Sequence, residues 1–298
     1  MRRDKKMPRL MIGAAAVAAL SLTLAACGSG DDDSGAGGES KEISIGYIPW
    51  DEDVAITLMW KKVLESKGYT VKLTKVDLAP VFAGMAKGDL DAYLDGWLPT
   101  THETYWKRYG NKLEDIGVWY GPATLGLAVP NYVKAQSIAD LKADAAKYDN
   151  RIVGIEPGAG EMGLTKDKVM PAYGLGDMKL VQSSTPAMLA QLKKSIGQKK
   201  PVVVTLWKPH WAYSKFPIRD LKDPKGAWGQ ADKIHVIARK GFSKDHPQVA
   251  EWWKNFKMSD KDLSKLEADI QDAGKGKEAQ GVQTWMDDNQ DYVKKLTA

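Results

Sequence analysis

The stretch APVFAGMAKGDLDAYLDGWLP, residues 79–99, runs from a proline-started helix into a strand that ends on a tryptophan and a proline. A second stretch, TPAMLAQLKKSIGQKKPVVVTLWKP, residues 185–209, repeats this order. Each Trp-x-Pro turn is closely followed by a histidine, His102 in the first copy and His210 in the second. The repeat predicts two lobes of similar topology, and it therefore decides the fold.

Strand-like and helix-like segments alternate on both sides of these repeats, which is typical of α/β lobes with mainly parallel sheets flanked by helices. The predicted strands are 43–48, 70–76, 91–97, 125–130, 151–157, 179–184, 201–207 and 234–241. The strands at 125–130 and 234–241 are predicted to cross between the lobes. Lobe 1 is then 42–129 plus 234–298, and lobe 2 is 130–233.

Three tryptophans stand at the predicted ends of strands, namely Trp50, Trp97 and Trp207. Ligands of open α/β sheets bind beyond the carboxyl ends of the strands, so these indoles are expected to face a cleft between the lobes. Indole faces attract cations, and a quaternary ammonium offers no hydrogen-bond donors, so an aromatic cage suits it. The alternative is that the three indoles plug the lobe interface. The other eight tryptophans are interpreted as packing residues.

The N-terminus has the layout of a secretory signal, with a basic start followed by an apolar run from Leu10 to Ala26. The run ends at Leu24-Ala25-Ala26-Cys27, which resembles a lipobox and implies cleavage before Cys27 and lipidation of its sulfur. An ordinary signal peptide with an incidental cysteine is the alternative. Residues 1–26 are therefore predicted to be a lipoprotein signal peptide, and the protein is expected to be anchored outside the cell membrane.

Residues 27–41 are rich in Gly, Ser and Asp and predict a flexible tether. The net charge of +5 belongs mostly to the leader, which holds five basic residues and one acidic residue, so about +1 remains for the rest. Without a basic stripe, the sequence gives no indication of nucleic-acid binding. No metal or cofactor motif is recognised either, and GAGEMG lacks the G-K-[ST] of a phosphate loop.

A secreted hydrolase that holds sugar on tryptophan platforms is a different functional class to consider. Glu156, Glu161 and Asp95 are its candidate paired carboxylates. No nucleophile-elbow or zinc motif accompanies them.

The roles of three other residues also remain open. His210 either contacts the ligand or holds its turn by a hydrogen bond, and Asp51 and Asp53 either cap a helix or contact an ammonium group.

Five segments together resemble the glycine betaine/proline betaine substrate-binding proteins of ABC importers. They are GYIPWDEDVA (46–55), KGDLDAYLDGWLPTTH (87–102), VGIEPGAG (153–160), VVVTLWKPHW (202–211) and HVIARKGF (235–242). The resemblance extends from about residue 42 to the C-terminus. It implies a two-lobed periplasmic-binding-protein fold with the ligand in the interlobe cleft, no catalytic activity and no cofactor.

The resemblance also implies a site. Trp50, Trp97 and Trp207 would enclose the trimethylammonium group. His102 and the backbone amides of Gly154 and Ile155 would donate hydrogen bonds to the ligand carboxylate. The implied protein is a monomeric receptor that closes about a hinge and delivers betaines to the permease and ATPase of an importer for osmoprotection.

A receptor for choline or carnitine remains open. Choline lacks a carboxylate, so it would make poor use of His102 and of the two amides. An acidic residue in the pocket would favour choline over betaine.

Overall fold

The computed structural model describes residues 41–298, so the predicted signal peptide, Cys27 and all but the last residue of the tether lie outside the described residues. None of the helices within 41–298 combines the length and the apolar character needed to cross a bilayer.

The strands of the described chain form a mixed sheet in the order β2-β1-β3-β9-β4-β7-β5-β6, with β8 added beside β4. Their bounds are β1 (Glu42–Tyr47), β2 (Thr70–Lys75), β3 (Ala92–Leu98), β4 (Leu113–Pro130), β5 (Arg151–Val153), β6 (Lys179–Val181), β7 (Val204–Lys208), β8 (Ile218–Asp220) and β9 (Asp232–Arg239). Within each half three strands pair in parallel, β2-β1-β3 in one half and β7-β5-β6 in the other. The antiparallel pairings all involve β4 or β9.

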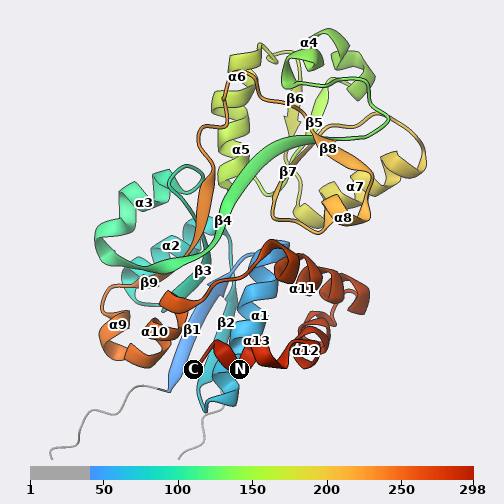
Figure 1. Cartoon of the computed structure of the whole chain (residues 1–298). Coiled ribbons are helices and arrows are strands. Elements are labelled where there is room, and N and C mark those ends of the chain that lie inside the picture. The colour runs from blue at the N-terminus through green and yellow to red at the C-terminus, as the bar shows by residue number, and fades with distance from the viewer. Residues whose placement is uncertain (1–40) are drawn as a thin grey trace, which may run out of the picture. The chain divides into compact units, whose positions relative to one another are not determined.

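β4 belongs to both halves of the sheet. Its first part pairs with β9, and its last part, from Thr124 to Ala128, pairs with β7. Figure 1 shows this long green strand passing from one group of strands to the other. The two groups, with the helices around them, are the two lobes of an α/β fold.

Two predictions about these crossings need correction. The strand expected at 125–130 is only the end of β4, because three register shifts and Pro122 break the period-two pattern between Leu113 and Ala123. The expectation that 234–241 crosses between the lobes is wrong. β9 pairs with β3 and β4 in the half of the sheet that also holds β1 and β2. The chain therefore returns from lobe 2 in the segment between β8 and β9.

Helices cover both parts of the sheet (Figure 1). They are α1 (Asp51–Ser66), α2 (Leu78–Lys87), α3 (Glu103–Tyr109), α4 (Leu141–Asp144), α5 (Gly160–Leu164), α6 (Met170–Tyr173), α7 (Thr185–Gly197), α8 (Ala212–Lys215), α9 (Phe242–Asp245), α10 (Pro247–Asn255), α11 (Asp260–Ala273), α12 (Glu278–Asp288) and α13 (Gln290–Lys295). The C-terminal helices belong to lobe 1, where α1 packs against α11 and α12, and α10 packs against β4.

An aromatic core holds lobe 1 together. Trp60 on α1 meets the edge of Phe256, with ring centroids 5.3 Å apart, and Trp253 on α10 stacks on Phe242 at 5.1 Å. Trp60, Trp253 and Phe242 are fully buried. These tryptophans act as packing residues, as predicted.

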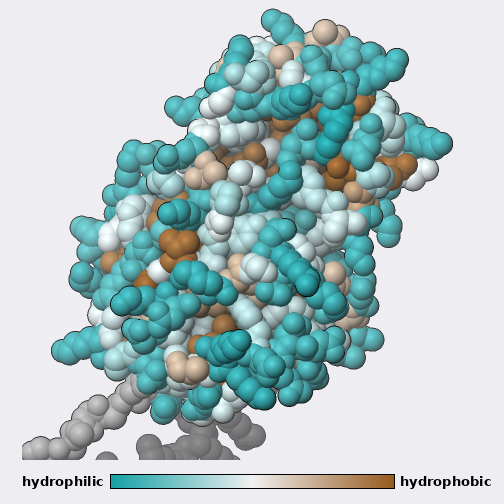
Figure 2. All heavy atoms as spheres, viewed as in Figure 1, coloured by the Kyte–Doolittle hydropathy of each residue, from teal (hydrophilic) through white to brown (hydrophobic). Residues whose placement is uncertain are grey.

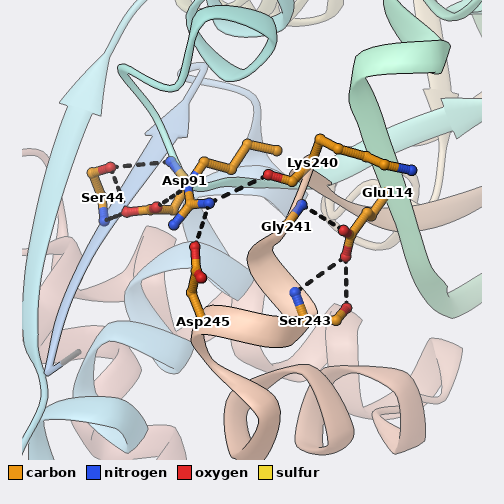
Figure 3. A network of polar contacts seen from close by, with 8 residues as sticks. Ser44, Asp91, Glu114, Lys240, Gly241, Ser243 and Asp245 are labelled. Carbon is orange, nitrogen blue, oxygen red and sulfur yellow. Dashed lines mark hydrogen bonds and ion pairs between the residues drawn. The ribbon is translucent and has the colours of Figure 1, made fainter. Parts of the chain in front are cut away.

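A polar network ties the strands of lobe 1 together at the end of the sheet where β1 and β3 begin (Figure 3). Asp91 accepts hydrogen bonds of 2.7 Å from both the backbone and the hydroxyl of Ser44, and it pairs with Arg239 at 2.7 Å. Burial opposes ionisation, but these hydrogen bonds and the guanidinium charge lower the pKa of Asp91. The network fixes the register of β1, β3 and β9, whose other ends carry the candidate site.

The outer surface is mainly hydrophilic on the face shown in Figure 2. Among residues 41–298, Tyr132 is the only large hydrophobic side chain classed as exposed, and its hydroxyl donates to the carbonyl oxygens of Ser195 and Lys200.

Candidate functional site

A small cavity lies between the lobes, where β3 and β7 end, and its empty space of about 270 Å³ includes open solvent. Even with that solvent counted, the space is below the roughly 300–1,000 Å³ of sites for drug-sized ligands, so the cavity suits a solute of few heavy atoms rather than an oligosaccharide. It is lined by Trp50, Glu52, Trp97, Thr101, His102, Leu125, Ile155, Ala159, Gly160, Glu161 and Trp207. Both lobes contribute to this lining.

The structure brings the three predicted tryptophans to this one cavity. Trp50 is the N-cap of α1, and its extended backbone (φ −88°, ψ 146°) turns the chain from β1 into the helix. Trp97 and Trp207 lie near the ends of β3 and β7. The rings of Trp50 and Trp207 meet edge to face with centroids 6.5 Å apart, and all three side chains are at most 5% exposed.

Each of these indoles donates its N–H to a carboxyl group. Trp97 donates to Asp95 at 2.9 Å and Trp207 donates to Glu52 at 2.9 Å. Trp50 donates to Glu156 at 3.3 Å. The two bonds made by Trp50 and Trp207 join the lobes. Because the ring edges are used in this way, the rings are fixed while their faces stay available to a ligand.

Three carboxyls in lobe 1 lie fully buried around these bonds. Burial raises the pKa of Glu52 and of Asp95 well above their usual ranges, and it raises the pKa of Asp53 to about 7. Repulsion from neighbouring carboxylates adds to the effect on Glu52 and Asp95, whereas the indole hydrogen bonds oppose it. The three groups therefore resist ionisation together.

His102 is oriented by the strand that precedes it. Its Nδ1 accepts a hydrogen bond of 3.0 Å from the backbone N–H of Trp97, so in the neutral ring the proton sits on Nε2. Burial lowers the pKa of His102 to about 3, so the ring is neutral near pH 7. No partner for Nε2 is found in the described part of the chain. The histidine thus offers a single free N–H donor at the cavity.

The two predicted backbone donors differ from one another. The N–H of Ile155, which lines the cavity, meets the Met162 sulfur at 3.3 Å, and a thioether is a weak acceptor. The N–H of Gly154 donates to the carbonyl of Val181 at 2.9 Å, and Gly154 is not part of the cavity lining. The structure therefore places the Gly154 amide in the sheet of lobe 2, contrary to the role implied for it. Only Ile155 keeps an amide suited to a ligand.

His210 and Asp51 lie beside the cavity but do not line it. Nδ1 of His210 accepts from the Ala212 backbone at 3.0 Å, and its Nε2 lies 3.2 Å from Asp51. Asp51 also accepts the indole N–H of Trp211 at 2.7 Å. Of the two alternatives for His210, the geometry favours the one in which it holds its turn. Asp51 joins α1 to lobe 2.

Of the two alternatives for Asp51 and Asp53, the one in which they cap a helix is wrong. α1 begins at Asp51, its N-cap is Trp50, and no side chain makes the cap hydrogen bond. Asp53 instead accepts from the backbone of Ile48 at 2.7 Å and from the hydroxyl of Thr57 at 3.0 Å.

The carboxyls considered for a hydrolase do not gather in the cavity. Asp95 and Glu156 are hydrogen-bonded to indoles and are absent from the lining, whereas Glu161 is part of it. Burial raises the pKa of Glu161 well above its usual range. Among residues 41–298 neither carboxyl oxygen of Glu161 has a hydrogen-bond partner. The backbone amides of Gly126 and Leu206 are nevertheless near enough to lower the pKa of Glu161 somewhat, against the larger effect of burial.

Sequence reasoning missed two features of the cavity wall. It did not single out Glu52, nor the role of Asp95 as the partner of a cage indole. A signal was present, since Glu52 lies two residues after Trp50 and Asp95 lies two residues before Trp97. The partner of Glu52 is Trp207, which is 155 residues away, and no local pattern reveals that pairing.

A family described as the substrate binding domain of ABC-type glycine betaine transport systems matches residues 41–288. The glycine betaine/carnitine transport binding protein GbuC of Listeria monocytogenes is 38% identical over 161 residues, which is 53% of this chain and 53% of that protein. The chain thus matches about half the length of this relative. The glycine betaine/proline betaine-binding periplasmic protein of Salmonella typhimurium is 26% identical over 278 residues, with 80% of this chain and 84% of that protein covered.

Solved structures agree with this likeness. Lactococcal OpuAC, in its closed conformation with glycine betaine, superposes with a TM-score of 0.81 and 35% identity, covering 87% of this chain and 100% of that chain. A choline-binding protein in complex with choline gives a TM-score of 0.78 at 22% identity, with 85% and 90% covered. At this identity, the likeness to the choline-binding protein is evidence for a shared fold and not for a shared ligand. The predicted two-lobed periplasmic-binding-protein fold is confirmed.

Proposed function

Because the chain belongs to the family of substrate-binding domains of ABC-type glycine betaine transport systems, we propose that it binds glycine betaine or a related quaternary-ammonium zwitterion. The observation that carries the proposal is the pairing of three indoles with one free N–H donor in a single buried cavity. The trimethylammonium group is enclosed by Trp50, Trp97 and Trp207. The carboxylate accepts hydrogen bonds from Nε2 of His102 and from the amide of Ile155.

The chemistry of the ligand fits the lining. Its cation is spread over methyl groups that have no donors, and each indole face contributes about 0.5–2 kcal/mol to holding it. Hydrogen bonds to its carboxylate contribute about 1.5–3 kcal/mol each. The groups come from both lobes, so bound ligand favours the closed arrangement, and the lobes close about a hinge.

One observation favours a second candidate, a receptor for choline or carnitine. Glu52 and Glu161 both line the cavity, and an ionised carboxylate there favours a ligand with net positive charge. Carnitine also carries a carboxylate, so it keeps the partners proposed for glycine betaine and adds a hydroxyl group. The relative from Listeria monocytogenes is described as a glycine betaine/carnitine binding protein.

Isothermal titration calorimetry separates these candidates. The protein comprising residues 28–298 is titrated with glycine betaine, carnitine, choline and proline at one pH. Saturable one-to-one binding of glycine betaine, with choline much weaker, supports the cage and the carboxylate anchor together. Choline binding as tightly as glycine betaine refutes the role of His102. Binding of none of the four refutes the proposed function.

The remaining parts of the proposal concern the setting of the protein. Lipidated Cys27 anchors it to the outer face of the cell membrane, where as a monomer without catalytic activity it delivers the solute to a permease and ATPase for osmoprotection. Fractionation of cells tests the anchor. The unaltered protein should sediment with membranes, whereas Cys27→Ser should not be anchored. An equal membrane fraction for both would refute lipid anchoring at Cys27.

A further inference from the structure

The wall of the cage that belongs to lobe 1 contains a group of three acidic side chains. Glu52 and Asp53 are on the first turn of α1, and Asp95 is on β3. Each is at most 1% exposed. Glu52 is itself part of the cavity lining. We call these three side chains the carboxyl layer.

The carboxyl layer is bonded to the cage. Its Glu52 and Asp95 accept the indole N–H groups of Trp207 and Trp97, both at 2.9 Å. Asp53 fixes the turn just before Trp50 by accepting the backbone N–H of Ile48 at 2.7 Å. A change in the charge of the layer therefore acts on the rings that face the ligand.

No basic side chain neutralises the carboxyl layer. Across residues 41–298, no Lys, Arg or His forms an ion pair with Glu52, Asp53 or Asp95. His102, which lines the same cavity, is neutral. The other titratable groups near the layer are Tyr93 on β3, whose hydroxyl donates to Asp95 at 3.4 Å, Tyr47 at the end of β1, Asp51 on the same turn of α1, buried Glu267 on α11, and Glu161 on α5 of lobe 2. Burial raises the pKa of Glu161 as well, so a proton that both carboxyl variants still release would come from outside the layer.

Uncompensated buried carboxylates are costly, so acidic groups in such surroundings keep their protons until a cation arrives. The cage next to this layer offers three indoles to a cation. Carboxyl groups bonded to the indoles also direct negative charge toward the rings, which strengthens their attraction for a cation.

We propose that Glu52, Asp53 and Asp95 share at least one proton in the empty protein, and that a quaternary ammonium entering the cage drives a proton from them to solvent. This inference rests on the proposed function and adds to it a role for two positioning residues, Glu52 and Asp95. The step is an acid dissociation, in which one carboxyl becomes a carboxylate and its proton passes to the buffer. The carboxylate then remains beside the cation.

The sign of the pH dependence follows. Ligand binds the ionised layer better, so affinity rises with pH until the carboxyls are ionised in the empty protein as well. The pKa of Asp53 is about 7, so the rise should be present near neutral pH. If one full proton is released, affinity changes about tenfold per pH unit on the acid side. His102, with a pKa of about 3, contributes nothing to this slope.

The test is calorimetry of glycine betaine binding to residues 28–298 at pH 7 in two buffers, phosphate and Tris, whose ionisation enthalpies differ. The difference in observed enthalpy gives the number of protons released. A measurable release is expected for glycine betaine and also for choline, because both carry the cation. Release with glycine betaine but not with choline would place the proton elsewhere and overturn the proposal.

Variants locate the proton. Glu52→Gln and Asp95→Asn keep a carbonyl oxygen for the indole N–H but cannot ionise, so each should release fewer protons, show a flatter pH profile and bind several-fold more weakly. Glu114→Gln is the matched control, because its carboxyl accepts from Gly241 and Ser243 away from the cavity. Its affinity and proton count should equal those of the unaltered protein.

Two outcomes separate this inference from the proposed function. The proposed proton release from the carboxyl layer is overturned if glycine betaine binds tightly without proton release. It is also overturned if the unaltered protein and both carboxyl variants release equal numbers of protons. Either result leaves the receptor function intact. If the unaltered protein binds no quaternary ammonium, both are overturned.

Discussion

Two groups of tryptophans in this molecule are equally buried but bonded differently. In the core of lobe 1 the indole N–H groups of Trp60 and Trp253 have no hydrogen-bond partner within the described residues, and their rings are packed by other aromatic rings. In the cage every indole N–H is bonded to a carboxyl. The two core indoles thus fill space in the apolar core, whereas the cage indoles are held by hydrogen bonds at their edges, which leaves their ring faces free to contact a ligand.

The largest effect should come from the core. Trp253→Ala should lower the free energy of unfolding by about 3–5 kcal/mol, because removal of a large buried ring leaves a cavity. The protein that remains folded should bind glycine betaine with unchanged affinity. Chemical denaturation measures the first quantity and calorimetry the second. A loss of affinity in folded Trp253→Ala would remove the distinction between the two groups.

Cage indoles should show the opposite pattern. The double variant Trp97→Ala, Trp207→Ala should bind glycine betaine about 5- to 1,000-fold more weakly, since two cation–π contacts of about 0.5–2 kcal/mol each are lost. Calorimetry of the folded variant measures this. An unchanged affinity would return these indoles to a packing role and refute the cage.

His102→Ala sharpens the comparison by removing the anchor that is not an indole. Affinity for glycine betaine should fall by about 1.5–3 kcal/mol, the value of a hydrogen bond to a charged group. Choline has no carboxylate, so its affinity should change far less. Equal losses for the two ligands would mean that His102 supports the cage rather than binding a carboxylate.

The smallest effect concerns the approach of the lobes. A Cβ added at Gly160 would lie 2.2 Å from the carbonyl oxygen of Thr101 in the other lobe. Gly160→Ala should therefore hinder closure and weaken binding by about 1–3 kcal/mol. Gly163→Ala is the matched control on the same helix, because its added Cβ meets nothing within 4 Å. Calorimetry should show unchanged affinity for the control, and equal affinities for both variants would contradict closure at this contact.

Much of this arrangement could be predicted from the sequence. The repeated helix, strand and Trp-x-Pro order indicated two lobes, and the positions of Trp50, Trp97 and Trp207 at strand ends indicated a shared cleft. Such predictions succeed because they depend on local periodicity and on the general placement of ligands at strand ends.

The predictions that failed depended on contacts between distant segments. Gly154 was expected to keep a free amide, but the neighbouring strand β6 takes it. The extent of β4 was missed because bulges interrupt its alternation. Helix capping was one of the two roles considered for Asp51, but its carboxylate accepts the indole N–H of Trp211 in the other lobe, 160 residues away. Glu52 was not singled out, and its partner Trp207 is 155 residues away. Partners of this kind are set by the tertiary structure.

The most direct test of the central claim is a crystal structure of residues 28–298 with glycine betaine. The account predicts the trimethylammonium group between the faces of Trp50, Trp97 and Trp207, and the carboxylate within hydrogen-bond distance of Nε2 of His102. A ligand bound outside this cavity, or one whose carboxylate faces the indoles and whose methyl groups face His102, would contradict it.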